Sequence, residues 1–386
     1  MQITPHDRLM RYGQLLQETL FGVLEAVTGP LSERARLLVA VLEMIPLSRQ
    51  LPCARGWLGR PAKHRHELAA AFLAKAVYGL ETTRQLLDRL HSDRQLRLLC
   101  GWTAVSQIPH EATFSRAFTE FAETELPQRL HAAVIEYEQK DRLIGHIARD
   151  STAIEAREKF PEPKAKKAKY QKRRKRAKAG ERGSRIERQR KQPLAQQLAG
   201  LPQNCSIGTK KSSKGHQQYW RGYKLHLDVA DGQIPISALL TGASVHDSQA
   251  AIPLMTMSSE RVTYLYDLMD SAYDAGAIRA HSLELGHRPI TDHPKRRRKV
   301  GEVKVPLRKN SKSFQRVAEI ETRAEEMTWA EKQRYAERTM VERVFSRLKD
   351  QFGARSIRLR GAPKIMAHLM FGVLALTVDQ LLKLTG

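Results

Sequence analysis

The segment 331–350 has two distinct faces if it is helical, and this pattern constrains the fold more than any other in the chain. A helix of 3.6 residues per turn returns residues 3, 4 and 7 positions apart to one side. The polar residues at these spacings are Tyr335, Arg338, Glu342 and Lys349. The opposite side is apolar and contains Met340, Val341, Val344 and Leu348. We therefore expect one helix that packs on a core and holds a polar stripe outward.

Two further acidic residues end apolar, strand-like runs. Asp150 ends LIGHIARD, and Asp270 ends VTYLYDLMD. Carboxylates on two strands, together with Glu342 on the helix, can share divalent metal, and oxygen ligands favour Mg²⁺ or Mn²⁺. On the helix, Glu342 is flanked by two cations and a phenol, a combination that suits a metal and phosphates. The expected cofactor is therefore a divalent metal such as Mg²⁺ or Mn²⁺.

The residues alone leave alternatives open at each acid. Asp150 begins an Asp-Ser-Thr sequence, which is also turn chemistry, so it could be a strand-end cap. Asp267 competes with Asp270, but it has the opposite strand parity. Asp247 could lie near the site or cap a helix that begins at Ser248.

These blocks resemble those of the DDE transposases of bacterial insertion sequences. In one group of that family the third acidic block reads Tyr, two residues, Arg, three, Glu, six, Lys, and Tyr335 to Lys349 reproduces this spacing. The resemblance covers most of residues 143 to 386. It also includes RDST at 149–152, GYKLH at 222–226, GASVHDS at 242–248 and DSAYD at 270–274. One position departs, since Ala272 stands where family members usually have Gly.

The resemblance implies a fold of the α+β or α/β class, with an RNase H-like mixed-sheet catalytic domain in residues 141–386. A basic insertion at about 157–218 would interrupt this domain. The resemblance also implies phosphodiester cleavage with two Mg²⁺ or Mn²⁺ ions per active site, and that the catalytic metal ligands are Asp150, Asp270 and Glu342. Two ions about 3.5 to 4 Å apart can together neutralise charge on the phosphorus and activate an oxygen nucleophile. It favours Asp270 over Asp267, because Ser-Ala-Tyr-Asp follows it as in the family block.

The other stripe residues have a different role by the same resemblance. Tyr335, Arg338 and Lys349 are expected to contact phosphates of the transposon end. Arg338 suits bidentate contact, whereas the ammonium of Lys349 is a compact point charge.

The first 140 residues are expected to form an all-helical domain for DNA-end binding or dimerisation. Helix-spaced apolar residues recur from 8 to 45 and from 67 to 92, and a helical stretch is expected from about 113 to 140. The stretch 55–90, followed by 108–118, also resembles the helical N-terminal domain common in such transposases.

The formal charge of +25 indicates a polyanionic partner, because neutralising phosphates releases condensed counterions. Segment 164–191 holds 15 Lys and Arg residues against two acids, and a second basic segment runs from 292 to 315. We interpret the first as an arm that follows DNA phosphates, with a passive solvated insertion as the alternative. The DNA-binding candidates in these segments are Lys172, Arg173, Arg174, Lys175, Arg176, Arg296, Arg297 and Arg298.

The cysteines and the longest apolar run argue against two other classes of protein, zinc modules and membrane proteins. Three isolated cysteines lack Cys-x-x-Cys spacing, which favours buried thiols in a reducing compartment over a zinc module. The apolar run 369–378 is too short to span a membrane, so we expect a packed helix. His281, His287 and His293 are expected at the surface or on phosphates. Trp220 and Trp329 are expected in the core, with base stacking as the alternative.

Three functions follow as hypotheses. The first is an insertion-sequence transposase, cytoplasmic and associated with the bacterial nucleoid, that cuts double-stranded DNA at element ends and joins them to target DNA. By the resemblance it would act as a homodimer on paired ends. The second is a nuclease of the same fold that only hydrolyses DNA. The third is a non-catalytic DNA-binding regulator derived from a transposase, which would not need all three acids.

Overall fold

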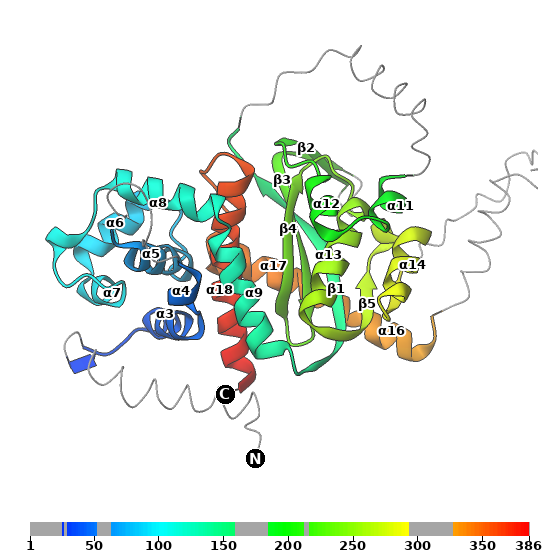
Figure 1. The fold of residues 1–386 in the computed structure, drawn as a ribbon, viewed down its shortest axis with the longest axis horizontal. Coiled ribbons are helices and arrows are strands. Elements are labelled where there is room, and N and C mark those ends of the chain that lie inside the picture. Colours follow the sequence, from blue (N-terminus) through cyan, green and yellow to red (C-terminus); the bar gives the residue numbers. More distant parts are fainter. Residues whose placement is uncertain are drawn as a thin grey trace, which may run out of the picture.

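The computed structural model describes residues 25–26, 29–51, 63–158, 184–211, 216–292 and 327–385. A group of helices from the first part of the chain lies beside a mixed sheet with helices on both faces (Figure 1).

The first group is all-helical, as expected. Its elements are α3 (Glu33–Met44), α4 (Leu47–Gln50), α5 (Arg65–Val77), α6 (Thr83–Ser92), α7 (Arg94–Leu99), η2 (Val105–Gln107), α8 (Glu111–Glu123) and α9 (Leu126–Gln139). Helix α5 is buried on nearly all sides, which fits its Ala- and Leu-rich sequence. The helical stretch expected over 113–140 is divided, because Glu125 adopts a left-handed conformation (φ +52°) just before Pro127 starts α9.

The sheet is RNase H-like and mixed, as expected. Its strands are β1 (Leu143–Glu155), β2 (Ser206–Lys211), β3 (Gln217–Ala230), β4 (Ile234–Gly242), β5 (Thr263–Met269) and β6 (Arg288–Thr291). The order is β2-β3-β1-β5-β6, with β4 also paired to β3. Strand β1 runs antiparallel to β3 and parallel to β5. The Asp231-Gly232 turn joins β3 and β4 as a hairpin, and Gly232 supplies the positive φ (+80°) that this turn uses.

Helices cover both faces of the sheet (Figure 1). Helices α13 (Ser248–Arg261) and α14 (Gly276–Glu284) lie on one face, and α17 (Met340–Gln351) lies on the other, against β1 and β3. The remaining elements are α11 (Arg185–Gln189), α12 (Leu194–Ala199), η3 (Ser271–Tyr273), α16 (Trp329–Ala336), η4 (Glu337–Thr339) and α18 (Ala362–Thr385).

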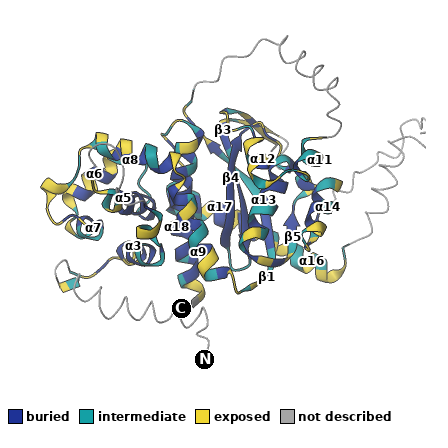
Figure 2. Ribbon diagram, viewed as in Figure 1, coloured by how far each residue is buried: buried dark blue, intermediate teal, exposed yellow. Residues whose placement is uncertain are grey.

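The last helix, α18, joins the two parts of the molecule. It contacts α3, α5, α8 and α9 on one side and β4 on the other, and it is largely buried (Figure 2). Within the described residues it has the length and composition to cross a membrane, but 83% of its most apolar window is buried. The expectation of a packed helix is confirmed. One apolar core runs from Leu38 through Phe371 to Leu227, so a domain boundary near residue 140 stays a prediction.

A buried ion triad ties the three central strands together. Arg149 on β1 lies 2.7 Å from Asp228 on β3 and 3.1 Å from Asp267 on β5, and all three side chains are fully buried. The hydroxyl of Ser258 donates to Asp228 at 2.7 Å, and that of Ser282 donates to Asp267 at 2.6 Å. The free-energy cost of burying these charges in a low-dielectric interior is offset only by such pairing and hydrogen bonding.

We predict that Arg149→Met lowers the free energy of unfolding by about 3 to 5 kcal/mol, because it leaves two buried carboxylates without their cation. Urea unfolding followed by circular dichroism would measure the change. Arg84→Met is the matched control, since Arg84 forms an exposed pair with Glu111 at 3.3 Å. It should change stability by less than about 1 kcal/mol. Equal effects from the two substitutions would contradict a structural role for the triad.

Candidate active site

Strand parity separates the buried triad from the acids of the candidate site. Successive side chains on a strand point to opposite faces. Arg149 therefore points to the face of the sheet that α13 covers, and Asp150 points to the opposite face, which α17 covers. Strand β5 pairs Asp267 with Ile147, which puts Asp267 on the Arg149 side. Asp267 is thus a structural partner of Arg149, which agrees with the prediction that Asp270 is the site residue.

Asp150 and Asp270 are each fixed by a neighbouring backbone amide. The N–H of Ser151 donates to Oδ1 of Asp150 at 2.7 Å, and the N–H of Ala272 donates to Oδ1 of Asp270 at 2.9 Å. Asp270 caps the N-terminus of η3 in this way. Ala272 does not adopt a positive φ and packs beside a small apolar cluster, so the backbone does not require the Gly usual in the family.

The third acidic segment is not the single helix that the sequence predicted. Helix α16 ends at Ala336, a 3₁₀ turn η4 follows, and α17 starts at Met340. The hydroxyl of Thr339 donates to the carbonyl of Ala336 at 3.1 Å, a local bond that competes with regular α-helical pairing. The apolar face predicted for this segment is confirmed, since α17 buries Met340, Val341, Val344 and Leu348.

The 3₁₀ turn places Arg338 between the acids. Residues three apart nearly eclipse in such a turn, and the Arg338 guanidinium lies 5.8 Å from the ring centroid of Tyr335. The same guanidinium is 3.5 Å from Asp150 and 3.3 Å from Glu342. Glu342 is the most open of the group, with 58% of its side chain exposed against 20% for Asp150. Arg338 therefore links the first and third predicted acids.

The electrostatics of the strand acids leave negative charge only partly balanced. Burial raises the pKa of Asp150 to about 6, and the nearby Asp270 and Asp247 carboxylates add to this against the effect of Arg338. Burial likewise raises the pKa of Asp270, with Asp247 adding to it. Carboxylates in this condition fit a bound cation, because a cation relieves both burial and mutual repulsion. Among the described residues, no three His, Cys, Asp or Glu side chains are already gathered closely enough to hold a metal ion.

Asp247 is a fourth carboxylate beside the site. It occupies the cap position of α13, but its side chain makes no capping bond there. Its Oδ1 accepts from Ser151 Oγ and from Lys224 Nζ, each at 2.9 Å. Burial alone would raise the pKa of Asp247, but His226 and Lys224 bring it below its usual range. The near-site alternative therefore holds, and Lys224 and His226 belong to the GYKLH block that the sequence analysis used only for resemblance.

Lys349 lies two turns beyond Glu342 on α17. Its Nζ donates to Thr152 Oγ1 at 2.7 Å, on the same face of β1 as Asp150. Burial lowers the pKa of Lys349, and the neighbouring cations Arg355 and Lys210 lower it further. The structure thus brings Tyr335, Arg338 and Glu342 to Asp150 and sets Lys349 farther along the same helix.

Several other expectations have mixed outcomes. His281 and His287 are buried, so the expectation of surface histidines is wrong for both, and His287 stacks on Tyr264 at 3.6 Å. Trp329 is 77% exposed, against the expectation of a core position. The predicted DNA-binding residues Lys172, Arg173, Arg174, Lys175, Arg176, Arg296, Arg297 and Arg298 lie outside the described residues, as does His293.

We predict that Asp150→Asn raises stability at pH 7.5 by up to about 3 kcal/mol and that this gain disappears near pH 4. Because the folded pKa of about 6 lies above the usual aspartate pKa of 3.8, the folded state holds a proton between these values that the unfolded state has released. Wild-type stability from this group therefore increases as pH falls through the window, whereas the amide has no such dependence. Urea titrations in EDTA at several pH values would measure the difference.

The exposed Glu337 on η4 provides a control for this experiment. Glu337→Gln should leave the pH dependence of the wild type unchanged. A pH-independent difference between Asp150→Asn and the wild type would contradict the raised pKa.

Comparison with known proteins gives two family matches. A family model described as "Transposase DDE domain" matches residues 141–378. A second model, described as "Transposase domain (DUF772)", matches residues 30–120. Neither curated proteins nor solved structures gave a match.

Proposed function

The chain belongs to the transposase DDE domain family, and from this premise we propose that it cleaves DNA at the ends of an insertion sequence and transfers the freed ends to target DNA. The proposal is supported above all by one arrangement. Two half-buried carboxylates with raised pKa values, Asp150 and Asp270, lie beside a 3₁₀ turn whose Arg338 links Asp150 to Glu342.

The residues that would hold metal are Asp150, Asp270 and Glu342. DDE transposases generally use divalent ions, and an all-oxygen donor set suits Mg²⁺ or Mn²⁺. When bound, two such ions would neutralise charge on the reacting phosphate and activate the attacking oxygen. The protein's contribution is to fix one oxygen of Asp150 and one of Asp270 through backbone N–H bonds, while the second oxygen of Asp150 faces Arg338, which a bound cation would replace.

The cations of the stripe would position the DNA. Arg338 now balances two acids, and its planar guanidinium can instead meet a phosphate when metal balances those acids. The ring of Tyr335 supports the guanidinium from one side. Lys349 would contact the backbone farther from the reacting phosphate.

The partners are double-stranded DNA at the element ends and in the target. We infer a homodimer on paired ends in the bacterial cytoplasm, with residues 1–140 binding the DNA end or the second copy. The transposase-domain match over residues 30–120 supports a family-specific role for these helices. The segment 164–191, with its excess of Lys and Arg, would follow phosphates.

We predict that Asp150→Asn, Asp270→Asn and Glu342→Gln each abolish Mg²⁺-dependent cleavage, because the amide keeps the size of the side chain and removes ligand charge. The substrate would be a labelled duplex that carries the inverted repeat flanking the gene, mixed with a target plasmid. Binding to the duplex in EDTA should persist in all three variants, and Glu337→Gln serves as the active control.

The products separate the candidate functions. Joined end-and-target products support a transposase, and cleaved ends without joining support a nuclease that only hydrolyses. Binding without any metal-dependent cleavage by the wild type would favour the non-catalytic regulator and overturn the proposal.

We predict opposite defects for two neighbouring stripe residues. Arg338→Ala should weaken binding to the end duplex in a salt-dependent way, because it removes a cation next to the reacting phosphate. Glu342→Gln should instead lower Mn²⁺ affinity, measured by calorimetry, and tolerate DNA. Arg343→Ala, an exposed neighbour bonded to Thr339, is the control for simple loss of charge. Equal loss of Mn²⁺ binding and of thermal stability in both stripe variants would show a structural ion pair instead.

A further inference from the structure

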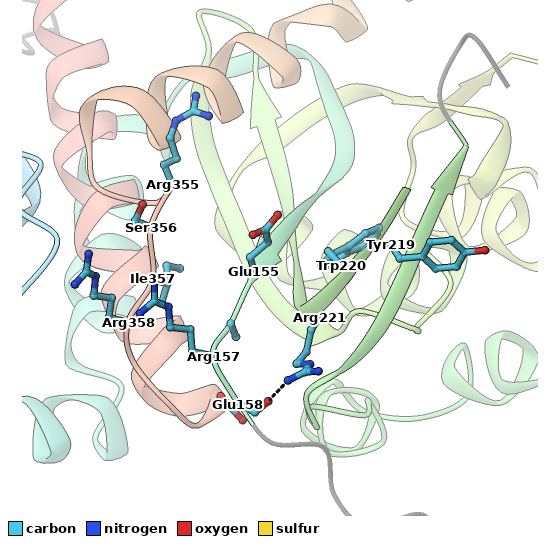
Figure 3. Close-up of a pocket in the computed structure, with 11 residues that line it drawn as sticks. Glu155, Arg157, Glu158, Tyr219, Trp220, Arg221, Arg355, Ser356, Ile357 and Arg358 are labelled. Carbon is cyan, nitrogen blue, oxygen red and sulfur yellow. Dashed lines mark hydrogen bonds between the residues drawn. The ribbon is translucent and has the colours of Figure 1, made fainter. Parts of the chain in front are cut away.

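A cleft of about 650 Å³ opens beyond the end of the polar stripe. Figure 3 shows its walls, which are the end of β1, the start of β3 and the segment that joins α17 to α18. Its floor includes the buried side chains of Ala156 and Ile357. Trp220 lies along one wall, where its Nε1–H donates to the carbonyl of Tyr223 at 3.1 Å. The cleft is therefore a built surface with a fixed apolar floor.

Arginines line this cleft from three segments of the chain. They are Arg157 after β1, Arg221 on β3, and Arg355 and Arg358 before α18. Arg355 and Arg358 are 68% and 54% exposed, and their partners Asp350 and Glu81 form surface pairs that contribute little stability. Four guanidinium groups around one cleft are suited to phosphate oxygens.

The two acids of the cleft do not cancel this charge. Glu158 is held in the wall, where it accepts from the hydroxyl of Tyr223 at 2.9 Å and from the N–H of Gly361 at 2.7 Å. Glu155 is exposed, and it alone among the cleft acids lies near Lys349. Four arginines face these two carboxylates and the surface partners Asp350 and Glu81, so the nearby Lys349 and Lys210 give this region its excess of positive charge.

The cleft is continuous with the candidate active site along two elements. Strand β1 runs from Asp150 through Thr152, which holds Lys349, to Glu155 in the cleft wall. Helix α17 runs in parallel from Glu342 to Lys349, about 10 Å along its axis. Since one DNA strand advances about 3.4 Å per nucleotide, Lys349 stands about three nucleotides from a phosphate at the acids.

From this geometry we propose that the cleft binds the phosphodiester backbone of the DNA strand that leaves the acidic site, about three to seven nucleotides from the scissile phosphate. This inference rests on the proposed function, because it takes the acids as the position of the scissile phosphate. The cleft would fix the direction in which the strand leaves, while the acids act on a phosphate that it holds in place.

The test is a phosphate scan combined with a double substitution. The probe is the end duplex in EDTA, with a neutral methylphosphonate placed singly at positions one to ten on either side of the cleavage point. In the wild type, a neutral group at a contacted position should weaken binding about tenfold. In Arg355→Gln/Arg358→Gln, the same positions should lose this effect, because their partners are already gone.

The dependence of binding on salt gives a second readout. The double variant should flatten the slope of log K against log salt by about 2, since each neutralised phosphate contributes about 0.9. The matched control is Arg142→Gln/Arg288→Gln, which removes two arginines that are 38% and 65% exposed, each with one carboxylate partner, at the edge of the sheet where β1 and β6 begin. The control should keep the full methylphosphonate effect at positions three to seven.

Two results would overturn the proposal: a methylphosphonate effect that is unchanged in the double variant, or no effect at positions three to seven in the wild type. If the double variant fails to fold by circular dichroism, Arg157→Gln, at an exposed residue of the cleft lining, gives the same scan with a smaller slope change of about 1. Cleavage of the unmodified duplex in Mn²⁺ is recorded separately. Loss of cleavage with an intact scan would count against the proposed chemistry but not against the cleft.

Discussion

The buried triad of Arg149, Asp228 and Asp267 is the interaction on which the candidate site depends. It joins β1, β3 and β5 at neighbouring positions along the strands. Its three charges can be buried only when the strand register brings the side chains into contact. A shift of the β1 register by one residue would turn the Arg149 side chain to the α17 face and the Asp150 side chain to the α13 face. These two adjacent residues therefore have different roles. The side chain of Arg149 sets the register of β1, and this register directs the side chain of Asp150 toward α17.

Charge balance at the site follows from this placement. Burial is the main reason that the pKa values of Asp150 and Asp270 are raised, and the nearby Asp247 carboxylate adds to this effect at both residues. Two cations, each from a different element, offset part of this negative charge. Lys224 on β3 holds Asp247, and Arg338 on η4 reaches Asp150. Asp247 is thereby kept ionised by its own partners, whereas Asp150 and Asp270 remain short of positive charge.

Much of this was predictable from the sequence, because the signals were local. Alternation and the Asp231-Gly232 turn predicted the strands and hairpin, and the apolar positions of α17 followed from helical period alone. The 3₁₀ turn before α17 was missed because no Gly or Pro marks it in the sequence. The role of Asp247 was left open because its partners come from β1 and β3, and only the strand register brings them together. The cleft was missed for the same reason, since its walls come from three distant segments.

The three predicted acids also differ in how firmly they are held, and this bears on how the site would assemble. Asp150 lies within β1 and Asp270 directly follows β5, and each has one oxygen fixed by a backbone N–H. Glu342 has a longer side chain, is 58% exposed, and is bound by Arg338 on the preceding turn. Helix α17 itself is anchored through its buried face. The backbone of Glu342 is thus held by the packing of α17 on the sheet, while its carboxylate is the least restrained of the three. A cation that gathers all three acids must draw Glu342 away from Arg338, and the same movement releases Arg338 toward a phosphate. If the acids bind metal and the stripe contacts DNA as proposed, these two events are therefore coupled through the ion pair of Arg338 with Glu342.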